Sequence, residues 1–272
     1  MKQKNLLLTA VLLLPLAELH AADNAPGKAH LPDSKQPPTA ENKWPEPPVV
    51  EPKYDGTLVP PPSKAVILFG GQNAEGWVAI PNPKNTNQSP QFIWKVENGY
   101  MEVVTPQGSR EQRLVGIGTK ENPITSGHLH IEWATPAEVK GTGQGRGNSG
   151  VFVGGFPELQ ILDSFNNTTV FDTQCAAFYK NRPPLVNASR GPGLWQSYDI
   201  YIQRTQVDAG KVIQPAVITV YHNNVLVHDH LTFPSPVQMS GLRLQDHLNP
   251  LRFRNIWFMP GEIVPHRSST ER

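Results

Sequence analysis

The sequence predicts an all-β protein, a jelly-roll β-sandwich that follows a signal peptide and a proline-rich linker. Two observations support this fold class. From about residue 64 onward, short apolar or alternating runs are separated by Gly, Pro, Asn and Asp, and no stretch sustains a 3.6-residue apolar period. Such spacing is typical of two-sheet sandwiches and barrels. No repeat of 33 or 40 residues is visible, which argues against a propeller.

The first 22 residues have the layout of a secretory signal. Lys2 and Lys4 precede an apolar run, and the small residues Ala21 and Ala22 follow it, where we expect cleavage. The run is short for a membrane span. We therefore predict an exported protein, periplasmic or extracellular, with no transmembrane segment. Cleavage takes the formal net charge from +1 to 0, so nothing in the charge favours nucleic acid as a partner.

A proline-rich linker is predicted over residues 23–63. Residues 23–62 contain 11 prolines and almost no apolar periodicity, so this segment is expected to be disordered or extended. A proline-rich ligand for a partner protein is the alternative reading. Four apolar residues are candidates to anchor the segment to the domain: Trp44, Val49, Val50 and Tyr54.

The jelly-roll domain is predicted over residues 64–260, with a tail at 261–272. Alternating or continuous apolar runs predict the strands in order: 65–69, 92–96, 100–104, 128–134, 150–153, 158–162, 198–204, 216–222 and 225–230, with a last strand around 255–257. The single cysteine, Cys175, lies in the apolar stretch QCAAFY, which predicts a buried small hydrophobe rather than a nucleophile. The fold must therefore be stable without an intramolecular disulfide.

Common catalytic signatures are missing from the sequence. It has no phosphate loop, dinucleotide fingerprint, HExxH or GxSxG. The glycine-rich run GTGQGRGNSG (141–150) lacks the Lys-Ser/Thr of a phosphate loop, and its glycines instead permit close approach to a ligand that Arg146 and Asn148 reach. In HLHIEW, His128, His130 and Glu132 share one strand face, which suits either a divalent metal or an ordinary solvated surface.

Two further clusters are candidate sites. Trp195, in GLWQSYDI, is either a stacking platform for a sugar or a core residue. Gln245, Asp246 and His247 end a strand-like run, where an Asp beside a His suits proton transfer near neutral pH. The alternating Arg252 and Arg254 are expected to form structural ion pairs.

The strand ELQILDS (158–164) carries an unusual number of polar residues. Glu158 and Gln160 point to one face and Leu159 and Ile161 to the core, because strand side chains alternate. Asp163 falls on the core side unless the strand bulges after Ile161.

Seven stretches, in order, resemble the 3-keto-disaccharide hydrolase family, which has a concanavalin A-like (lectin/glucanase) jelly roll. They are LFGGQNAEGW (68–77), WKVENGYMEV (94–103), NSGVFV (148–153), ELQILDS (158–164), PPLVNASRGPGLWQSYDI (183–200), VITVYHNNVLV (217–227) and LQDHLNPLRFRNIW (244–257). The resemblance implies a secreted or periplasmic protein acting on glycosides oxidised at C3. Two positions where the family has glycine hold Leu248 and Asn224 here.

The same strand also looks like the Glu-x-Asp-x-x-Glu strand of laminarinase-type glycosidases. Gln160 and Asp163 replace two of its acids, which disfavours ordinary retaining hydrolysis, since that reaction needs paired carboxylates. A 3-keto sugar needs only a base for the acidified C2 hydrogen, an acid for the leaving oxygen and a group that polarises the ketone.

On this hypothesis His247, oriented by Asp246, acts as base or acid, and Glu158 is the complementary carboxylate. The predicted substrate-binding residues are Gln160, Gln245, Asn148, Trp195, Arg146 and Asp163. The substrate is an oxidised disaccharide or glycoside, and a divalent cation is a possible Lewis acid. Two alternatives stay open: a non-catalytic carbohydrate-binding module, and an envelope interaction protein tethered by its proline-rich arm.

Overall fold

The computed structural model describes residues 44–83, 91–104, 114–121, 123–233 and 241–261. All of them belong to the second of two units, residues 31–272. The predicted signal peptide, residues 23–43 of the predicted linker and residues 262–272 of the predicted tail lie outside the described residues. In the part of the chain that is described, no helix is both long and apolar enough to cross a membrane.

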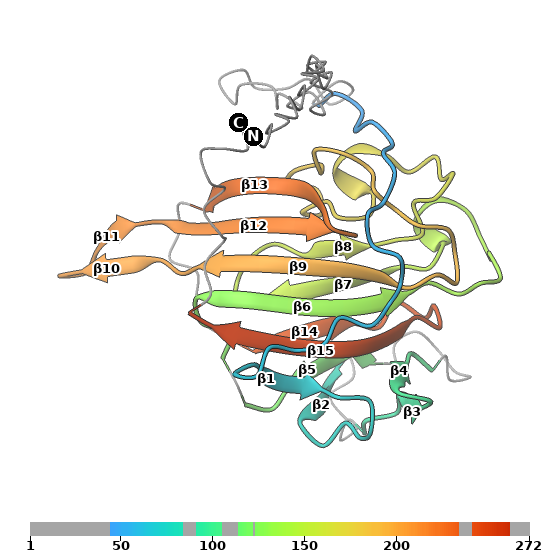
Figure 1. The fold of residues 1–272 in the computed structure, drawn as a ribbon, viewed down its shortest axis with the longest axis horizontal. Coiled ribbons are helices and arrows are strands. Elements are labelled where there is room, and N and C mark those ends of the chain that lie inside the picture. The colour runs from blue at the N-terminus through green and yellow to red at the C-terminus, as the bar shows by residue number, and fades with distance from the viewer. Residues whose placement is uncertain (1–43, 84–90, 105–113, 122, 234–240, 262–272) are drawn as a thin grey trace, which may run out of the picture. The chain divides into compact units, whose positions relative to one another are not determined.

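Two antiparallel sheets form most of the described domain (Figure 1). The larger sheet contains, from one edge, β13 (Val225–Phe233), β12 (Ala216–His222), β9 (Gln196–Gln203), β6 (Gly127–Ala134), β15 (Arg252–Pro260), β4 (Tyr100–Glu102) and β3 (Lys95–Glu97), and β1 (Val66–Phe69) also pairs with β15. The smaller sheet runs β2 (Trp77–Pro81), β5 (Leu114–Thr119), β14 (Leu242–Gln245), β7 (Ser149–Val153) and β8 (Leu159–Ile161). The all-β jelly-roll prediction is confirmed.

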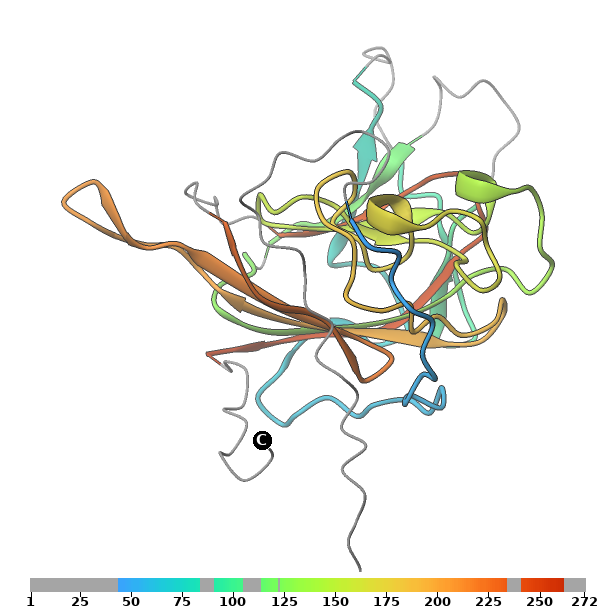
Figure 2. The same ribbon diagram turned by 90° about the horizontal axis from the view of Figure 1, so that it is seen from above.

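Several elements were not predicted. The strands β2, β5, β10 (Gln206–Asp208) and β11 (Lys211–Gln214) are new, and two short 3-10 helices, η2 (Gly143–Gly145) and η3 (Phe171–Thr173), lie in loops. The hairpin β10–β11 projects away from the sheets (Figure 2). Its apolar residues Val207, Val212 and Ile213 are exposed, so they give no alternation between a buried and a solvated face. That alternation is the signal by which strands are recognised in a sequence.

The core lies between the two sheets and follows strand alternation. In β6, Leu129, Ile131 and Trp133 are fully buried on the inner face, and Ile117 of β5 and Leu244 of β14 face them from the smaller sheet. Because alternate residues point to opposite faces, the side chains between these positions lie on the outer faces of the sheets. The glycines of the first candidate site described below and the histidines of the second lie on such outer faces.

Cys175 is confirmed as a buried thiol. It is 1% exposed, and its Sγ lies 3.1 Å from the hydroxyl of Tyr198. Burial raises the pKa of this thiol to about 11, and the hydrogen bond with Tyr198 only partly offsets that effect. A thiol that stays protonated at neutral pH is a poor nucleophile.

Residues 44–63 run past the loops at the ends of the strands and then over the outer face of the larger sheet, and we call this segment the arm (Figure 1). The backbone N–H groups of Lys53 and Tyr54 donate to the carbonyl of Asn223, and Val49 forms a parallel bridge with Asn187. Tyr54 is 4% exposed, whereas Val49 is 80% exposed. Of the predicted anchors, Tyr54 is therefore held through its side chain and Val49 through its backbone.

Candidate functional site

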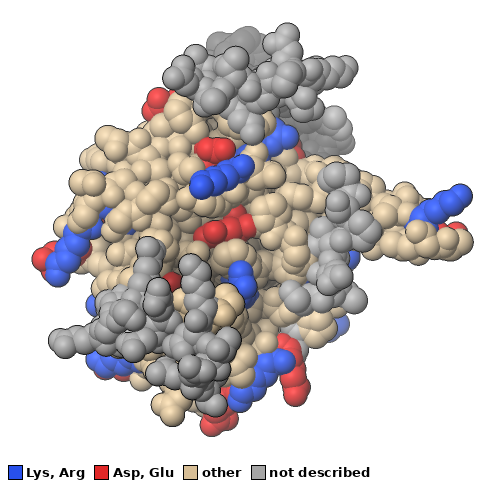
Figure 3. All heavy atoms as spheres, turned by 180° about the vertical axis from the view of Figure 1, so that it is seen from behind, with Lys and Arg blue, Asp and Glu red and all other residues tan. Residues whose placement is uncertain are grey.

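The outer face of the smaller sheet has a floor of glycines. Gly116 and Gly118 of β5 lie opposite Gln245 and Arg243 of β14, and Gly150 of β7 lies opposite Gln160. Ile117, between the first two glycines, and Val151, next to Gly150, are buried in the core. Figure 3, seen from the side opposite to Figure 1, shows acidic and basic side chains close together in the middle of the visible face. Glycine at these positions lets other groups approach closely: the Glu158 carboxylate lies over Gly150, the Ile80 side chain over Gly118 and the Leu244 carbonyl against Gly116.

Glu158 lies directly over this floor. A Cβ added at Gly150 would collide with the Glu158 carboxylate, so the glycine is what allows the carboxylate to occupy this place. Burial raises the pKa of Glu158 to about 7, although Arg243 on β14, beyond β7 in the sheet, acts to lower it. The Arg243 guanidinium itself stacks on the Phe152 ring, 4.0 Å from its centroid. A carboxyl group with this pKa exchanges protons readily at neutral pH.

Gln144 hydrogen-bonds to three residues at this site, Asn148, Gln160 and Thr173, and it was not among the residues predicted from the sequence. Its Oε1 accepts hydrogen bonds from the side-chain amides of Asn148 and Gln160, each 3.0 Å away, and its Nε2 donates to the carbonyl of Thr173 at 2.7 Å. Gln160 is 1% exposed. The sequence points to Gln144 only through its position in the run GTGQGRGNSG, which also contains the predicted substrate-binding residues Arg146 and Asn148.

A pocket of about 310 Å³ adjoins this amide network. Its lining comprises Thr135, Pro136, Glu138, Val139, Lys140, Arg146, Gly147, Asp163, Leu248, Asn249 and Pro250. The Asn249 side-chain carbonyl accepts a hydrogen bond from the backbone N–H of Asn148, 2.8 Å away, and so ties the pocket to the Gln144 network. This volume is at the lower end of the range for small-ligand sites and suits a sugar unit.

Arg146 and Asp163, both predicted to bind substrate, form an ion pair in the pocket wall. Arg146 Nη2 lies 2.6 Å from Asp163 Oδ2. The strand β8 ends at Ile161, so Asp163 is placed by the loop that follows and not by a bulge within the strand. It therefore lies in the pocket wall with Arg146, while Glu158 lies over the glycine floor.

The stretch Gln245–Leu248 turns sharply at the end of β14. Asp246 Oδ2 accepts a hydrogen bond from the Trp94 indole N–H at 3.0 Å, and its Oδ1 accepts one from the Leu248 N–H at 3.1 Å. His247, between them, is half-buried and directly precedes the pocket-lining Leu248. Leu248 has φ 70°. This left-handed conformation favours glycine over a residue with a Cβ.

Trp195 lies on the other sheet. The guanidinium of Arg254, on β15, stacks 4.0 Å from its ring centroid, and the Tyr100 ring of β4 is 6.2 Å away. The contacts described here thus link Asn148, Gln160, Arg146 and Asp163 to the pocket, and place Trp195 on the larger sheet. Arg252 pairs with Glu102 and Arg254 with Glu132, as the structural interpretation of these arginines predicted.

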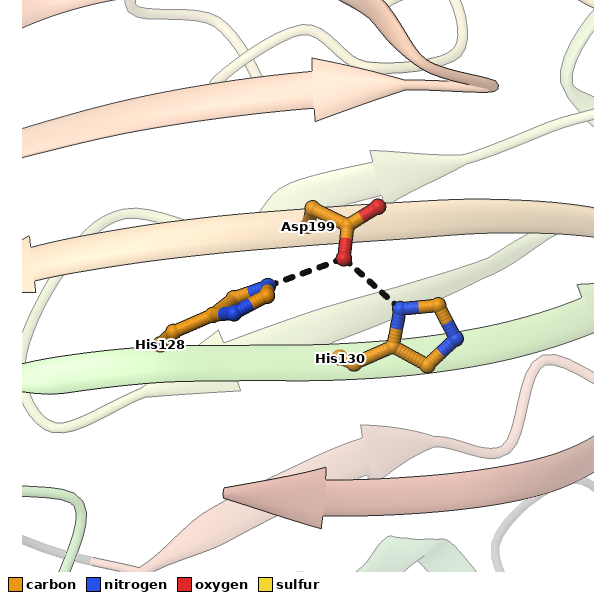
Figure 4. A group of neighbouring side chains, drawn as sticks. All are labelled: His128, His130 and Asp199. Carbon is orange, nitrogen blue, oxygen red and sulfur yellow. Dashed lines mark hydrogen bonds and ion pairs between the residues drawn. The ribbon is translucent and has the colours of Figure 1, made fainter. Parts of the chain in front are cut away.

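A second polar cluster lies on the outer face of the larger sheet (Figure 4). His128 and His130 of β6 are joined by Asp199 of β9, which is the register partner of His130. Asp199 Oδ1 lies 2.9 Å from His128 Nε2 and 2.7 Å from His130 Nδ1. His130 and Glu132 are 0% exposed, so this face is not the solvated surface that was one of the two predicted alternatives.

The cluster alternates positive and negative groups. Burial acts to lower the pKa of His130, but its hydrogen bonds to Asp199 and Glu132 outweigh that effect and raise the pKa to about 9. Burial acts to raise the pKa of Glu132, yet hydrogen bonds, led by that from His130, lower it to about 2. The pKa of Asp199 is likewise held below its usual range against burial, by its hydrogen bonds to His128 and His130.

Comparison with known proteins assigns a family. The family model described as the 3-keto-alpha-glucoside-1,2-lyase-like domain matches residues 64–259. A solved structure of a candidate glycosyl hydrolase from Parabacteroides distasonis ATCC 8503 matches with a TM-score of 0.60 and 32% identity, over 79% of this chain and 92% of that one. A second candidate glycosyl hydrolase from the same organism has a TM-score of 0.51 and 16% identity, over 71% and 92%, and shares the fold.

No protein among the curated sequences matches the chain. The family model nevertheless covers well over half of its residues, and the family is one of carbohydrate-active proteins. The fold, the ordered motifs and this match lead to one conclusion: the chain belongs to the 3-keto-alpha-glucoside-1,2-lyase-like domain family.

Proposed function

We propose that this carbohydrate-active protein cleaves 3-keto-glycosides by elimination followed by hydration. The observation that carries the proposal is Glu158, a carboxyl group placed over a glycine floor and raised by burial to a pKa of about 7. A group with this pKa can take up or deliver a proton at working pH. The family description supports the substrate class.

The reaction balances with one base and one acid. The base removes the C2 hydrogen, which the C3 ketone acidifies, and the electron pair passes through the enolate to form the C1–C2 double bond. The C1–O bond then breaks, and the departing oxygen takes a proton from the acid. Water adds across the double bond to give the free 3-keto sugar. Glu158 and His247 are assigned to these proton transfers, in an order that the kinetics must establish.

The neighbouring amides provide the binding groups. Gln160, Asn148 and Gln245 are assigned to substrate hydroxyls or the keto oxygen, and Gln144 holds the first two in place through its hydrogen bonds. The buried Gln160 Oε1 has no hydrogen-bond partner among the described residues. An unpaired buried acceptor costs free energy, so a hydrogen bond donated by a ligand hydroxyl is expected to favour binding. The adjoining pocket then holds one sugar unit.

The test is turnover of a 3-keto substrate. The purified chain is offered 3-keto-trehalose and a 3-keto-glucoside, and sugar release is followed together with the ultraviolet absorbance of an enone intermediate. Glu158→Gln and His247→Ala are each expected to lower kcat by about 100-fold or more, whereas Glu121→Gln, at an exposed position, leaves it unchanged.

Two results would overturn the proposal. One is full activity in both Glu158→Gln and His247→Ala, which would remove these side chains from the mechanism. The other is affinity for unoxidised glycans without turnover of any 3-keto-glycoside, which would identify a carbohydrate-binding module.

A further inference from the structure

The His128–His130–Asp199 cluster takes no part in the proposed reaction. It lies on the outer face of the larger sheet, whereas Glu158 lies over the glycines of the smaller sheet, and the core of the domain separates the two faces. The three residues nevertheless converge: one ligand atom from each lies within 4.8 Å of the other two. Figure 4 shows both imidazoles turned toward the same carboxylate oxygen.

We propose that His128 Nε2, His130 Nδ1 and Asp199 Oδ1 bind a divalent transition-metal ion of the Zn²⁺ class. Two imidazoles and one carboxylate are a frequent ligand set for such ions, and imidazole nitrogen disfavours Ca²⁺ and Mg²⁺. The two nitrogens now lie 2.9 Å and 2.7 Å from the oxygen. Two ligand atoms that each lie about 2.0–2.2 Å from a tetrahedral ion are slightly farther from each other than these atoms are now. Small rotations of the side chains would therefore be sufficient to admit the ion.

The rings are already oriented by their surroundings. His128 stacks on Tyr201 with centroids 4.2 Å apart, and His130 stacks on Trp257 with centroids 4.8 Å apart. A β-bulge in β15 places Trp257 there: Arg254 pairs with Glu132 and Trp257 with His130, so β15 has one extra residue between the two pairs. Preorientation of this kind lowers the entropy lost when ligands bind a metal.

A carboxylate hydrogen-bonds to the non-ligating nitrogen of one histidine, as in many histidine–metal sites. The second nitrogen of His130, Nε2, lies 3.4 Å from Glu132 Oε1. Glu132 is itself held by the Val59 N–H of the arm at 2.9 Å, by the Asn255 amide at 2.7 Å and by Arg254 at 2.6 Å. This arrangement directs His130 Nδ1 toward the proposed ion, and binding would displace the proton shared with Asp199.

The proposed ion would have a structural role. It would join β6 to β9 and, through His130 and Glu132, connect both strands to the arm. Asp199 has a side chain 15% exposed, which gives an entry path and a place for a water ligand. The proposal is independent of the reaction proposed above, because none of its ligands is assigned to proton transfer or substrate binding.

The experiment titrates the full chain, freed of metal by a chelator, with Co²⁺ and Zn²⁺. We expect one Co²⁺ per chain with visible d–d absorption, displacement of Co²⁺ by Zn²⁺, and a rise in Tm with Zn²⁺ but not with Ca²⁺. His128→Gln and Asp199→Asn are expected to weaken Co²⁺ binding at least about 10-fold. The matched control is His230→Gln, which removes an exposed histidine that pairs with Asp229 on β13.

Failure to bind one Co²⁺ per chain, or equal affinity in His128→Gln and the parent protein, overturns the proposal. Far-ultraviolet circular dichroism of the metal-free variants shows whether they are folded. If they are not, X-ray absorption of the parent protein's zinc complex decides the matter. Two imidazole ligands support the site, and one or none refutes it.

Discussion

Glu158 is a residue whose position favours chemistry at the expense of stability. Its carboxyl group has an unfolded pKa near 4.5 and a folded pKa of about 7, because it is partly buried. The folded state therefore holds the proton more tightly, and its stability falls as pH rises from 4.5 through 7. Residues that destabilise a fold in this way are common at functional sites.

Replacing Glu158 by Gln is therefore expected to stabilise the protein above pH 7 while lowering kcat as proposed above. Gln removes the partly buried charge, so the free energy of unfolding should increase by about 1 kcal/mol at pH 8; solvent screening keeps the gain below the full shift. Urea denaturation at pH 5 and pH 8 measures it, and the gain should be smaller at pH 5. A loss of stability at pH 8 would show that the carboxylate is well solvated.

Leu248 is a second residue that lowers the stability of the fold, through its backbone conformation. Its φ of 70° is unfavourable for a side chain with a Cβ by about 1–2 kcal/mol. Leu248→Gly should raise the free energy of unfolding by up to about 1 kcal/mol after the extra chain entropy of glycine is included. Asn224, at φ 61°, provides the comparison: Asn224→Gly should change stability less, since Asn tolerates this region. Guanidinium denaturation of both variants tests the order, and a destabilised Leu248→Gly would reverse it.

At the scale of elements, β6 and β9 are joined by charge as well as by backbone hydrogen bonds. The imidazolium of His130 lies between the carboxylates of Asp199 and Glu132. Its pKa is about 6.5 in the unfolded chain and about 9 in the folded protein. The stabilisation it provides is complete below pH 6.5 and is lost as pH rises through 9.

The stability of the metal-free protein should therefore fall by about 2 kcal/mol between pH 6.5 and 9. His222 and His228, whose pKa values burial lowers to about 3 and about 4, act below this window. In His130→Gln the decline between pH 7 and 9 should become much smaller, with the remainder at its lower end due to Glu158. Chemical denaturation at half-unit pH steps gives the slope, and an unchanged slope in the variant would assign it to other groups.

At the scale of the molecule, the folded domain extends beyond the residues that the family model matches. The match begins at residue 64, but the arm provides partners to the larger sheet before that point. Arg254 donates to the carbonyl of Gly56 and Asn255 to that of Val59, while Val59 donates to Glu132. Without the arm, Glu132 loses one donor and its cover.

A chain that begins at residue 64 should be less stable than one that begins at residue 44, by about 2–4 kcal/mol. Thermal unfolding of the two chains under equal conditions measures the difference. Equal Tm values would show that water replaces the partners of Glu132 and Arg254 without cost, and that the arm only rests on the sheet.

The sequence alone determined the all-β class, the burial of Cys175, the pairing role of Arg252 and Arg254, and the grouping of Asn148, Arg146, Gln160 and Asp163 near one site. Local alternation and turn residues are sufficient to predict the all-β class. Short sequence motifs predict the other three features. Only the tertiary structure decided that Trp195 lies on the other sheet, that Gln144 hydrogen-bonds to both Asn148 and Gln160, and that the arm binds Glu132. These depend on which strands become neighbours and on how deeply each group is buried, and contacts between residues a hundred positions apart leave no periodic signal in the sequence.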